Sequence, residues 1–200
     1  YTRAFIAEFA ARGGDEYEAT VRTLTASDNP DIAWRARRAL AARGLVDADA
    51  IEAWRSADGS GEAARMSVEA LASLPLEDAR SRAWESVYSE SLSNDFLTAT
   101  LAGLNASSWE GDSGLDSAVD RLRSYWEAHT IGMALRYANG VLAYGLDIDR
   151  DGSIERSVGL LRGWLDAHGD APAQLRRIVL EHLDAFERDE RVQRRWKQDQ

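Results

Sequence analysis

The stretch that most constrains the fold is residues 68–94, VEALASLPLEDARSRAWESVYSESLSN. Apolar side chains recur there with the 3.6-residue period of a helix, at Leu76, Ala79, Ala83, Val87 and Tyr88. Pro75 suits the first turn of that helix, where its missing N–H costs nothing. Ser93 suits the N-cap of a further helix. Helices joined by such short turns pack antiparallel, so the stretch predicts a helical hairpin.

The same helical period recurs along the whole chain, without a convincing strand. The predicted helices cover about residues 2–12, 15–26, 30–43, 47–57, 62–73, 76–88, 94–105, 115–129, 130–146, 153–168 and 172–195. Connections this short are typical of antiparallel helix pairs, although no strict repeat is visible. We therefore expect an all-α fold, an irregular α-solenoid of the HEAT or armadillo kind with about eleven helices in antiparallel pairs. No linker divides the chain, so we expect one domain over residues 1–200.

Local signals fix several helix ends. Asn29 and Pro30 have the residue types of an N-cap and a first helical position, and Gly44 is expected to end the helix that they begin. Residues 106–114, ASSWEGDSG, have the composition of a loop.

Composition excludes several partners. The chain has 24 basic and 34 acidic residues and a formal net charge of −10, which disfavours nonspecific binding to nucleic acid or to an anionic membrane. No apolar run is long enough to span a bilayer. Cysteine is absent, which fits a cytoplasmic protein. The chain begins at Tyr1 without a leader, so we expect it to be a piece of a longer polypeptide.

One segment matches part of a calcium-binding loop. Asp147, Asp149 and Asp151 stand at its first, third and fifth positions, and Gly152 at its sixth. Val158 occupies the twelfth position, where a bidentate Glu is needed. A helix-breaking turn is the favoured interpretation of the segment. A weak ion site formed by the carboxylates of Asp147, Asp149, Asp151 and Glu155 is the alternative.

Other chemistry-bearing residues are scattered. His129, His168 and His182 lack the spacing of metal ligands, and the H-E-x-x-H motif is absent. There is no phosphate-binding glycine loop and no G-x-S-x-G motif. Most tryptophans fall on apolar stripes and are expected to pack between helices. Trp109 and Trp196 lie in a loop and a polar tail, so their exposure would indicate a contact surface. Basic clusters near the C-terminus are interpreted as solvated helix faces with i,i+4 ion pairs.

Three blocks of the sequence together carry a family resemblance. The first holds Asp58, Pro75, Arg80, Ala83-Trp84 and Leu92-Ser93-Asn94. The second holds Trp164-Leu165, Leu175-Arg176-Arg177-Ile178-Val179, Glu181, Asp184 and Arg188. The third, looser block runs from Asp28 through Trp34 and Leu40-Ala41-Ala42 to Gly44. In order and spacing these blocks resemble the C-terminal helical domain of M1-family zinc aminopeptidases, of the aminopeptidase N type found in actinobacteria. Gly103-Leu104 stands where that family usually has Gly-Phe.

The resemblance implies a role without assigning catalytic residues to this chain. In that family the zinc ligands, H-E-x-x-H with a downstream Glu, and the G-x-M-E-N substrate loop lie in an earlier domain. This chain would then be a non-catalytic capping domain without a cofactor of its own. Its partners would be the catalytic domain of the same polypeptide, which holds the zinc, and the peptide substrate enclosed between them.

Two alternative functions remain open. The chain could be a freestanding HEAT-like α-solenoid that binds a partner protein on its concave face. It could also be a helical enzyme that binds a metal at residues 147–155.

Overall fold

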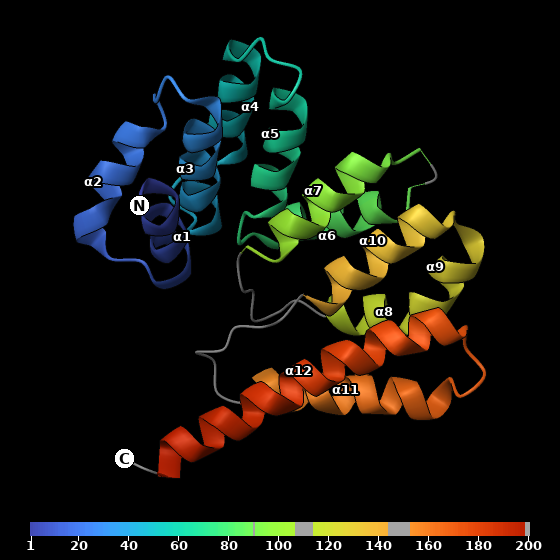
Figure 1. Cartoon of the computed structure of the whole chain (residues 1–200). Coiled ribbons are helices and arrows are strands. Elements are labelled where there is room, and N and C mark those ends of the chain that lie inside the picture. The colour runs from blue at the N-terminus through green and yellow to red at the C-terminus, as the bar shows by residue number, and fades with distance from the viewer. Residues whose placement is uncertain (90, 107–113, 144–152, 199–200) are drawn as a thin grey trace. The chain divides into compact units, whose positions relative to one another are not determined.

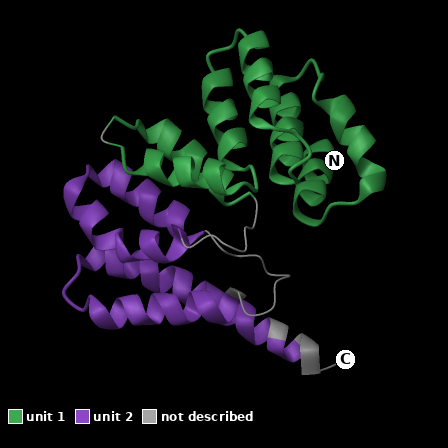
Figure 2. Ribbon diagram, turned by 180° about the vertical axis from the view of Figure 1, so that it is seen from behind, with its two compact units in different colours: residues 1–112 green, residues 113–200 purple. Residues whose placement is uncertain are grey.

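The computed structural model describes residues 1–89, 91–106, 114–143 and 153–198, without the side chains of 153, 193 and 196–198. The described residues form twelve α-helices and no strand, which confirms the all-α prediction (Figure 1). The chain divides into an N-terminal unit, residues 1–112, and a C-terminal unit, residues 113–200 (Figure 2). The expectation of one capping domain over residues 1–200 stays a prediction.

The N-terminal unit contains seven helices. They are α1 (Thr2–Arg12), α2 (Asp15–Leu24), α3 (Pro30–Ala42), α4 (Ala48–Ala57), α5 (Ala63–Ala72), α6 (Glu77–Val87) and α7 (Asn94–Leu104). The odd-numbered helices form one row, in which α1 contacts α3, α3 contacts α5, and α5 contacts α7. The even-numbered helices α2, α4 and α6 each pack against the odd-numbered helix that follows. This two-layer arrangement of hairpins is the repeat-like fold expected from the sequence.

Side-chain caps explain where several of these helices begin. The Asn29 side chain accepts hydrogen bonds from the backbone N–H groups of Asp31 and Ile32, and Pro30 follows it as the first helical residue. The Ser93 hydroxyl accepts from the N–H of Phe96 at the start of α7. The predicted roles of Asn29, Pro30 and Ser93 are thus confirmed.

Gly44 ends α3 as predicted, and its conformation shows why glycine is needed. Its φ is +67°, in the left-handed region that other residues rarely adopt. Its N–H donates to the carbonyl of Ala41, and the N–H of Leu45 donates to the carbonyl of Leu40. These two bonds satisfy carbonyls that a helix end would otherwise leave unpaired.

The hairpin at residues 68–94 exists, but two details of its prediction are wrong. Helix α6 begins at Glu77, so Pro75 lies before the helix and not in its first turn. Leu76 has extended backbone angles and an exposed side chain, whereas an inward side chain was expected. Leu74, on the other side of Pro75, is buried in its place. Leu74, which precedes the proline, is biased toward extended backbone and lies outside both helices.

The core of the N-terminal unit has two neighbouring clusters. One brings Trp34, Ile51, Leu74 and several alanines of α3, α5 and α6 together. The other joins Ile6 and Phe9 of α1 to Val21 of α2 and to Leu40 and alanines of α3. Alanines allow the helix backbones to approach each other closely.

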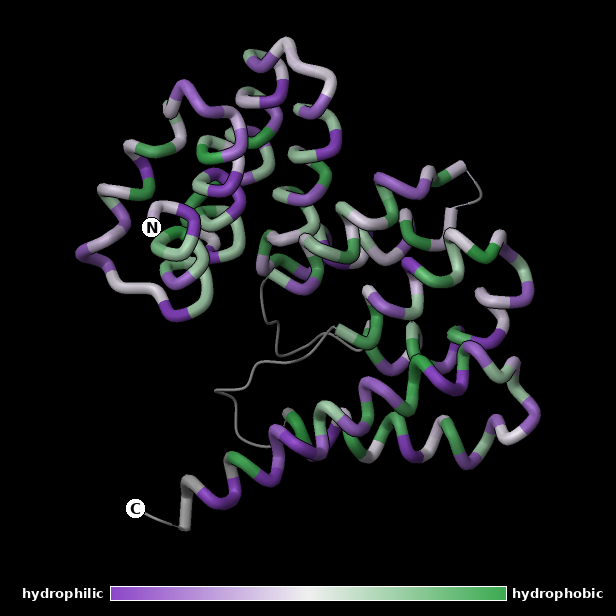
Figure 3. The backbone as a smooth tube through the Cα atoms, in the orientation of Figure 1, coloured by the Kyte–Doolittle hydropathy of each residue, from purple (hydrophilic) through white to green (hydrophobic). Residues whose placement is uncertain are grey.

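The C-terminal unit contains five helices. They are α8 (Gly114–Asp120), α9 (Leu122–Ala128), α10 (Ile131–Leu142), α11 (Ser153–Ala167) and α12 (Ala173–Gln198). Neighbouring helices pair as α9 with α10 and α11 with α12, while α10 also contacts α12 and α8 contacts α11. The final turns of α12 are mostly hydrophilic (Figure 3).

The single helix predicted over 115–129 is wrong, because the chain forms α8 and α9 with a break at Arg121. The N–H of Arg121 still bonds to the carbonyl of Ser117, and that of Tyr125 bonds to the carbonyl of Arg121. Leu122 on one side of the break and Ala118 on the other are both buried. The break therefore keeps both short helices on the core without leaving these backbone groups unpaired.

Candidate functional site

The possible ion loop lies mostly outside the described residues. Asp147, Asp149 and Asp151 belong to the segment 144–152, which the structure does not describe. Glu155 is exposed in the first turn of α11. Within the described ranges, no group of three His, Asp or Glu side chains could hold a metal ion. The ion site at residues 147–155 therefore stays a prediction.

Two of the three histidines serve the ends of their own helices. The Nδ1 atom of His129 lies 3.0 Å from the carbonyl oxygen of Tyr125, and the two rings stack with centroids 3.8 Å apart. His168 repeats this arrangement with Trp164, at 2.9 Å from the carbonyl oxygen and 4.6 Å between centroids. Rings held this way stabilise the C-terminal turn of a helix. Among the described residues, neither ring has the hydroxyl partner that a nucleophile–base pair requires.

His182 lies on α12, half-buried against α10. Its Nε2 atom is 3.4 Å from the side-chain oxygen of Asn139, a long contact that joins the two helices. Burial lowers the pKa of His182, and the nearby Glu181 carboxylate partly opposes that shift. The neutral ring is thus favoured at this inter-helix contact.

Residues from two separate blocks of the family pattern meet at α3 and the end of α4. The indole Nε1–H of Trp34 donates to the carboxylate of Asp58 at 2.7 Å. The backbone N–H of Ser60 donates to the other oxygen of Asp58 at 2.9 Å. The Trp34 bond, followed by the bonds from Ser60, holds the pKa of Asp58 below its usual range. Asp58 therefore ties the α4–α5 connection to the core.

Arg37 of α3 lies beside this contact and is half-buried. Its guanidinium carbon is 4.8 Å from the centroid of Trp34 and 5.5 Å from that of Trp54. It also donates to the carbonyl of Thr25 at 2.9 Å. Desolvation lowers the pKa of Arg37, while the charge of Asp58 acts in the opposite direction. The cation–π contacts place the guanidinium of Arg37 against both indole rings.

Arg80 and Trp84 of α6 are buried, as expected of residues with an architectural role. Arg80 is only 2 % exposed, and its Nη2 donates to the backbone carbonyl of Leu104, the last residue of α7, at 3.1 Å. A C-terminal helix carbonyl has no partner within its own helix, so a buried cation there is favourable. The Trp84 ring stacks on Tyr88 at 6.5 Å between centroids. Asn94 is exposed as the first residue of α7.

The second block holds α11 against α12. Arg176 donates to the backbone carbonyls of Leu165 and His168, at 3.1 and 2.7 Å. The predicted i,i+4 ion pairs on the surface of α12 are confirmed for Arg177 with Glu181 and for Arg194 with Glu190. In the described part of α12 these contacts occupy Arg176, Arg177 and Arg194.

Neither tryptophan that was expected to mark a contact surface can be placed. Trp109 lies outside the described residues, and the side chain of Trp196 also lies outside them. Their exposure therefore stays a prediction.

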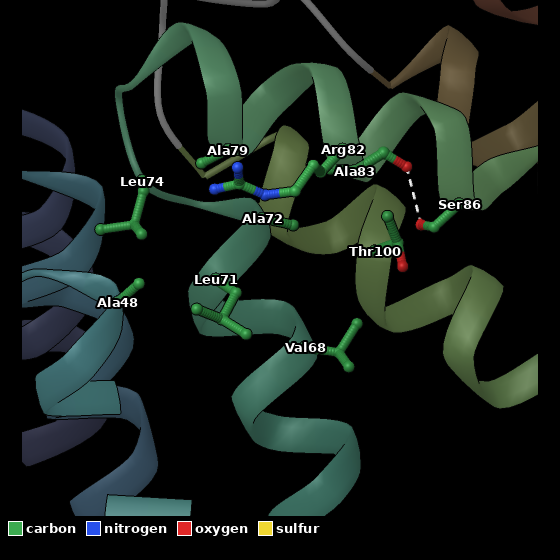
Figure 4. A pocket seen from close by; sticks show the side chains of 10 residues that line it. All are labelled: Ala48, Val68, Leu71, Ala72, Leu74, Ala79, Arg82, Ala83, Ser86 and Thr100. Atoms are coloured by element: carbon green, nitrogen blue, oxygen red, sulfur yellow. Dashed lines mark hydrogen bonds between the residues drawn. The ribbon is translucent and has the colours of Figure 1, made fainter. Parts of the chain in front are cut away.

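The N-terminal unit contains a groove that was not predicted. It has a volume of about 240 Å³ and lies between α5, α6 and α7, with the first residue of α4 at one end (Figure 4). Its walls are largely apolar and include Val68, Leu71, Leu74 and Ala83, while Arg82 is the charged residue that lines it. The only sequence signal was the run of small residues in α5 and α6, which leaves space between crossing helices.

Comparison with known proteins adds no assignment. No protein-family model matches the chain, and no curated protein sequence matches it.

Proposed function

We propose that this chain is a non-catalytic C-terminal helical module of a zinc aminopeptidase that removes N-terminal residues from peptides. The observation that carries the proposal is the hydrogen bond between Trp34 and Asp58. These residues belong to two blocks of the family pattern that were identified separately, and they are 24 positions apart. Their meeting in one partly buried contact supports treating the two blocks as one pattern.

Contacts within the first block support the same proposal. Arg80 bonds to the carbonyl of Leu104, which stands at the position where the family has Phe after Gly. Ser93 of the Leu-Ser-Asn segment caps α7, the helix that ends at Leu104. These residues of the family pattern thus maintain the packing of α6 on α7. Such a structural role fits a module that supports a reaction in another domain.

The module would act by presenting a surface at a fixed distance from a catalytic domain of the same polypeptide. A row of packed helices forms such a surface, and its movement as a rigid body gates access to an enclosed peptide. The zinc ion of the catalytic domain would activate the attacking water. In this proposal the contribution of the chain would be to enclose substrate and exclude solvent.

The gene that encodes this chain tests the proposal. We expect an upstream H-E-x-x-H motif with a downstream Glu in the same reading frame, several hundred residues before Tyr1. A reading frame without this motif would overturn the proposal and favour a freestanding interaction module.

The isolated 200-residue chain gives a second test, by hydrolysis of an aminoacyl amide with and without added zinc. We expect no turnover in either case. Robust hydrolysis by this chain alone would contradict its assignment as non-catalytic.

A further inference from the structure

The groove of the N-terminal unit holds a cation that its own helix leaves unpaired. Arg82 follows Asp78 by four residues on α6, the spacing that gives ion pairs at Arg22 with Glu18 and at Arg35 with Asp31. Among the described residues, however, Arg82 forms no ion pair and no hydrogen bond. Its side chain instead extends past Ala79 toward Leu74, along the groove (Figure 4).

The other polar groups of the groove do not offer free donors. The Ser86 hydroxyl donates to the backbone carbonyl of Ala83 at 2.8 Å. The Thr100 hydroxyl donates to the carbonyl of Phe96, also at 2.8 Å. No carboxylate lines the groove, in a chain whose net charge is −10. Arg82 is therefore the one charged group among the described lining residues, and it is exposed and available to an anionic partner at the groove.

The shape and chemistry of the groove define that partner. One guanidinium matches the two oxygens of a carboxylate in a bidentate pair, whereas the second charge of a phosphate would need another cation. The remaining walls are aliphatic and favour a hydrocarbon. A volume of about 240 Å³ corresponds to roughly eight groups of water size at about 30 Å³ each.

We propose that this groove binds an aliphatic monocarboxylate of about six to eight carbons, with the carboxylate on Arg82 and the chain against Val68, Leu71 and Ala83. The proposal is independent of the aminopeptidase assignment, because it rests on the groove alone.

The test titrates ¹⁵N-labelled protein with butanoate, hexanoate and octanoate and follows backbone amide shifts. We expect saturable shifts in α5 and α6, with the dissociation constant falling by up to about fourfold for each added methylene. 1-Octanol, which keeps the hydrocarbon without the charge, should bind about two- to fivefold more weakly than octanoate, because Arg82 is exposed. Equal binding of the alcohol and the acid would overturn the proposal. So would the absence of a saturable shift in these helices at about 10 mM octanoate.

Three variants sharpen the test. Arg82→Gln should weaken octanoate binding by about two- to fivefold and remove its advantage over octanol. Arg55→Gln is the matched control, since it removes an exposed α4 arginine that pairs with Glu52, and it should bind octanoate like the wild type. Ser86→Leu should fill the groove and abolish binding of both ligands, with an unchanged helical circular-dichroism spectrum. Unchanged octanoate binding in Arg82→Gln would contradict the role of the guanidinium.

Discussion

The indole nitrogen of Trp34 on α3 lies 2.7 Å from a carboxylate oxygen of Asp58, the residue that follows α4. Trp34 is 2 % exposed, so its N–H has little access to water and depends on this acceptor. Because the bond favours the charged carboxylate, it makes stability depend on pH.

Asp58→Asn should flatten the acid limb of the stability profile. The Trp34 hydrogen bond lowers the pKa of Asp58 in the folded chain, so the unfolded chain binds its proton more readily. The resulting stabilisation is present above the unfolded pKa of about 3.9 and is lost as pH falls through the lower folded pKa. Urea unfolding between pH 7 and pH 3 measures this. Asp166→Asn on the exposed face of α11 makes the same charge change and serves as the control. Equal acid limbs in Asp58→Asn and wild type would contradict the assignment.

Arg80→Met should destabilise the N-terminal unit by about 1.5–3 kcal/mol, because the buried carbonyl of Leu104 loses a charged donor. Arg82→Met changes the same residue type two positions along α6, where the side chain is exposed and bonds to no described residue. That control should stay within about 0.5 kcal/mol of wild type. The midpoints of urea unfolding of the two variants measure the difference in stability loss. Equal losses would show that Arg80 acts as an ordinary surface residue.

Gly103→Ala should be strongly destabilising because α5 and α7 cross at this residue. An added Cβ would lie 2.3 Å from the backbone carbonyl oxygen of Glu69 and 2.7 Å from the Cβ of Ala72. Backbone atoms cannot move aside as a flexible side chain does, so we expect a loss of about 2–4 kcal/mol.

The matched control for that substitution is Gly159→Ala on α11. No atom lies within 4 Å of its added Cβ. Alanine is the better helix former, so this variant should gain up to about 1 kcal/mol. Thermal melts of both variants measure the contrast. Tolerance of Gly103→Ala would mean that α5 and α7 do not cross as closely as described.

Local sequence signals were sufficient for most of the fold. Caps and breakers such as Asn29, Gly44 and Ser93 act through bonds to residues a few positions away, so their roles could be read directly. Where packing between helices determines which side chain is buried, the prediction was wrong. Leu76 fits the apolar stripe of α6, yet Leu74 takes the buried place beside Pro75.

The candidate sites depended more heavily on contacts between helices. The family pattern indicated that Arg80 and Trp84 matter, but the acceptor of Arg80, Leu104, lies 24 residues further along the chain. The groove at Arg82 arises where small residues of α5 and α6 leave space, and no periodic pattern records such a space. The lack of an ion pair between Arg82 and Asp78, four residues apart on α6, is likewise visible only in the three-dimensional structure.

No helix within the described ranges combines the length and the apolar character needed to cross a bilayer.

The most direct test of the account measures zinc content and aminopeptidase activity of the complete encoded polypeptide beside those of this 200-residue chain. The account predicts about one zinc ion per complete polypeptide, with hydrolysis of an aminoacyl amide that a chelator abolishes. It predicts neither bound zinc nor hydrolysis for the 200-residue chain alone. A complete polypeptide without zinc and without this activity would contradict the account, and so would an isolated chain that hydrolyses the substrate by itself.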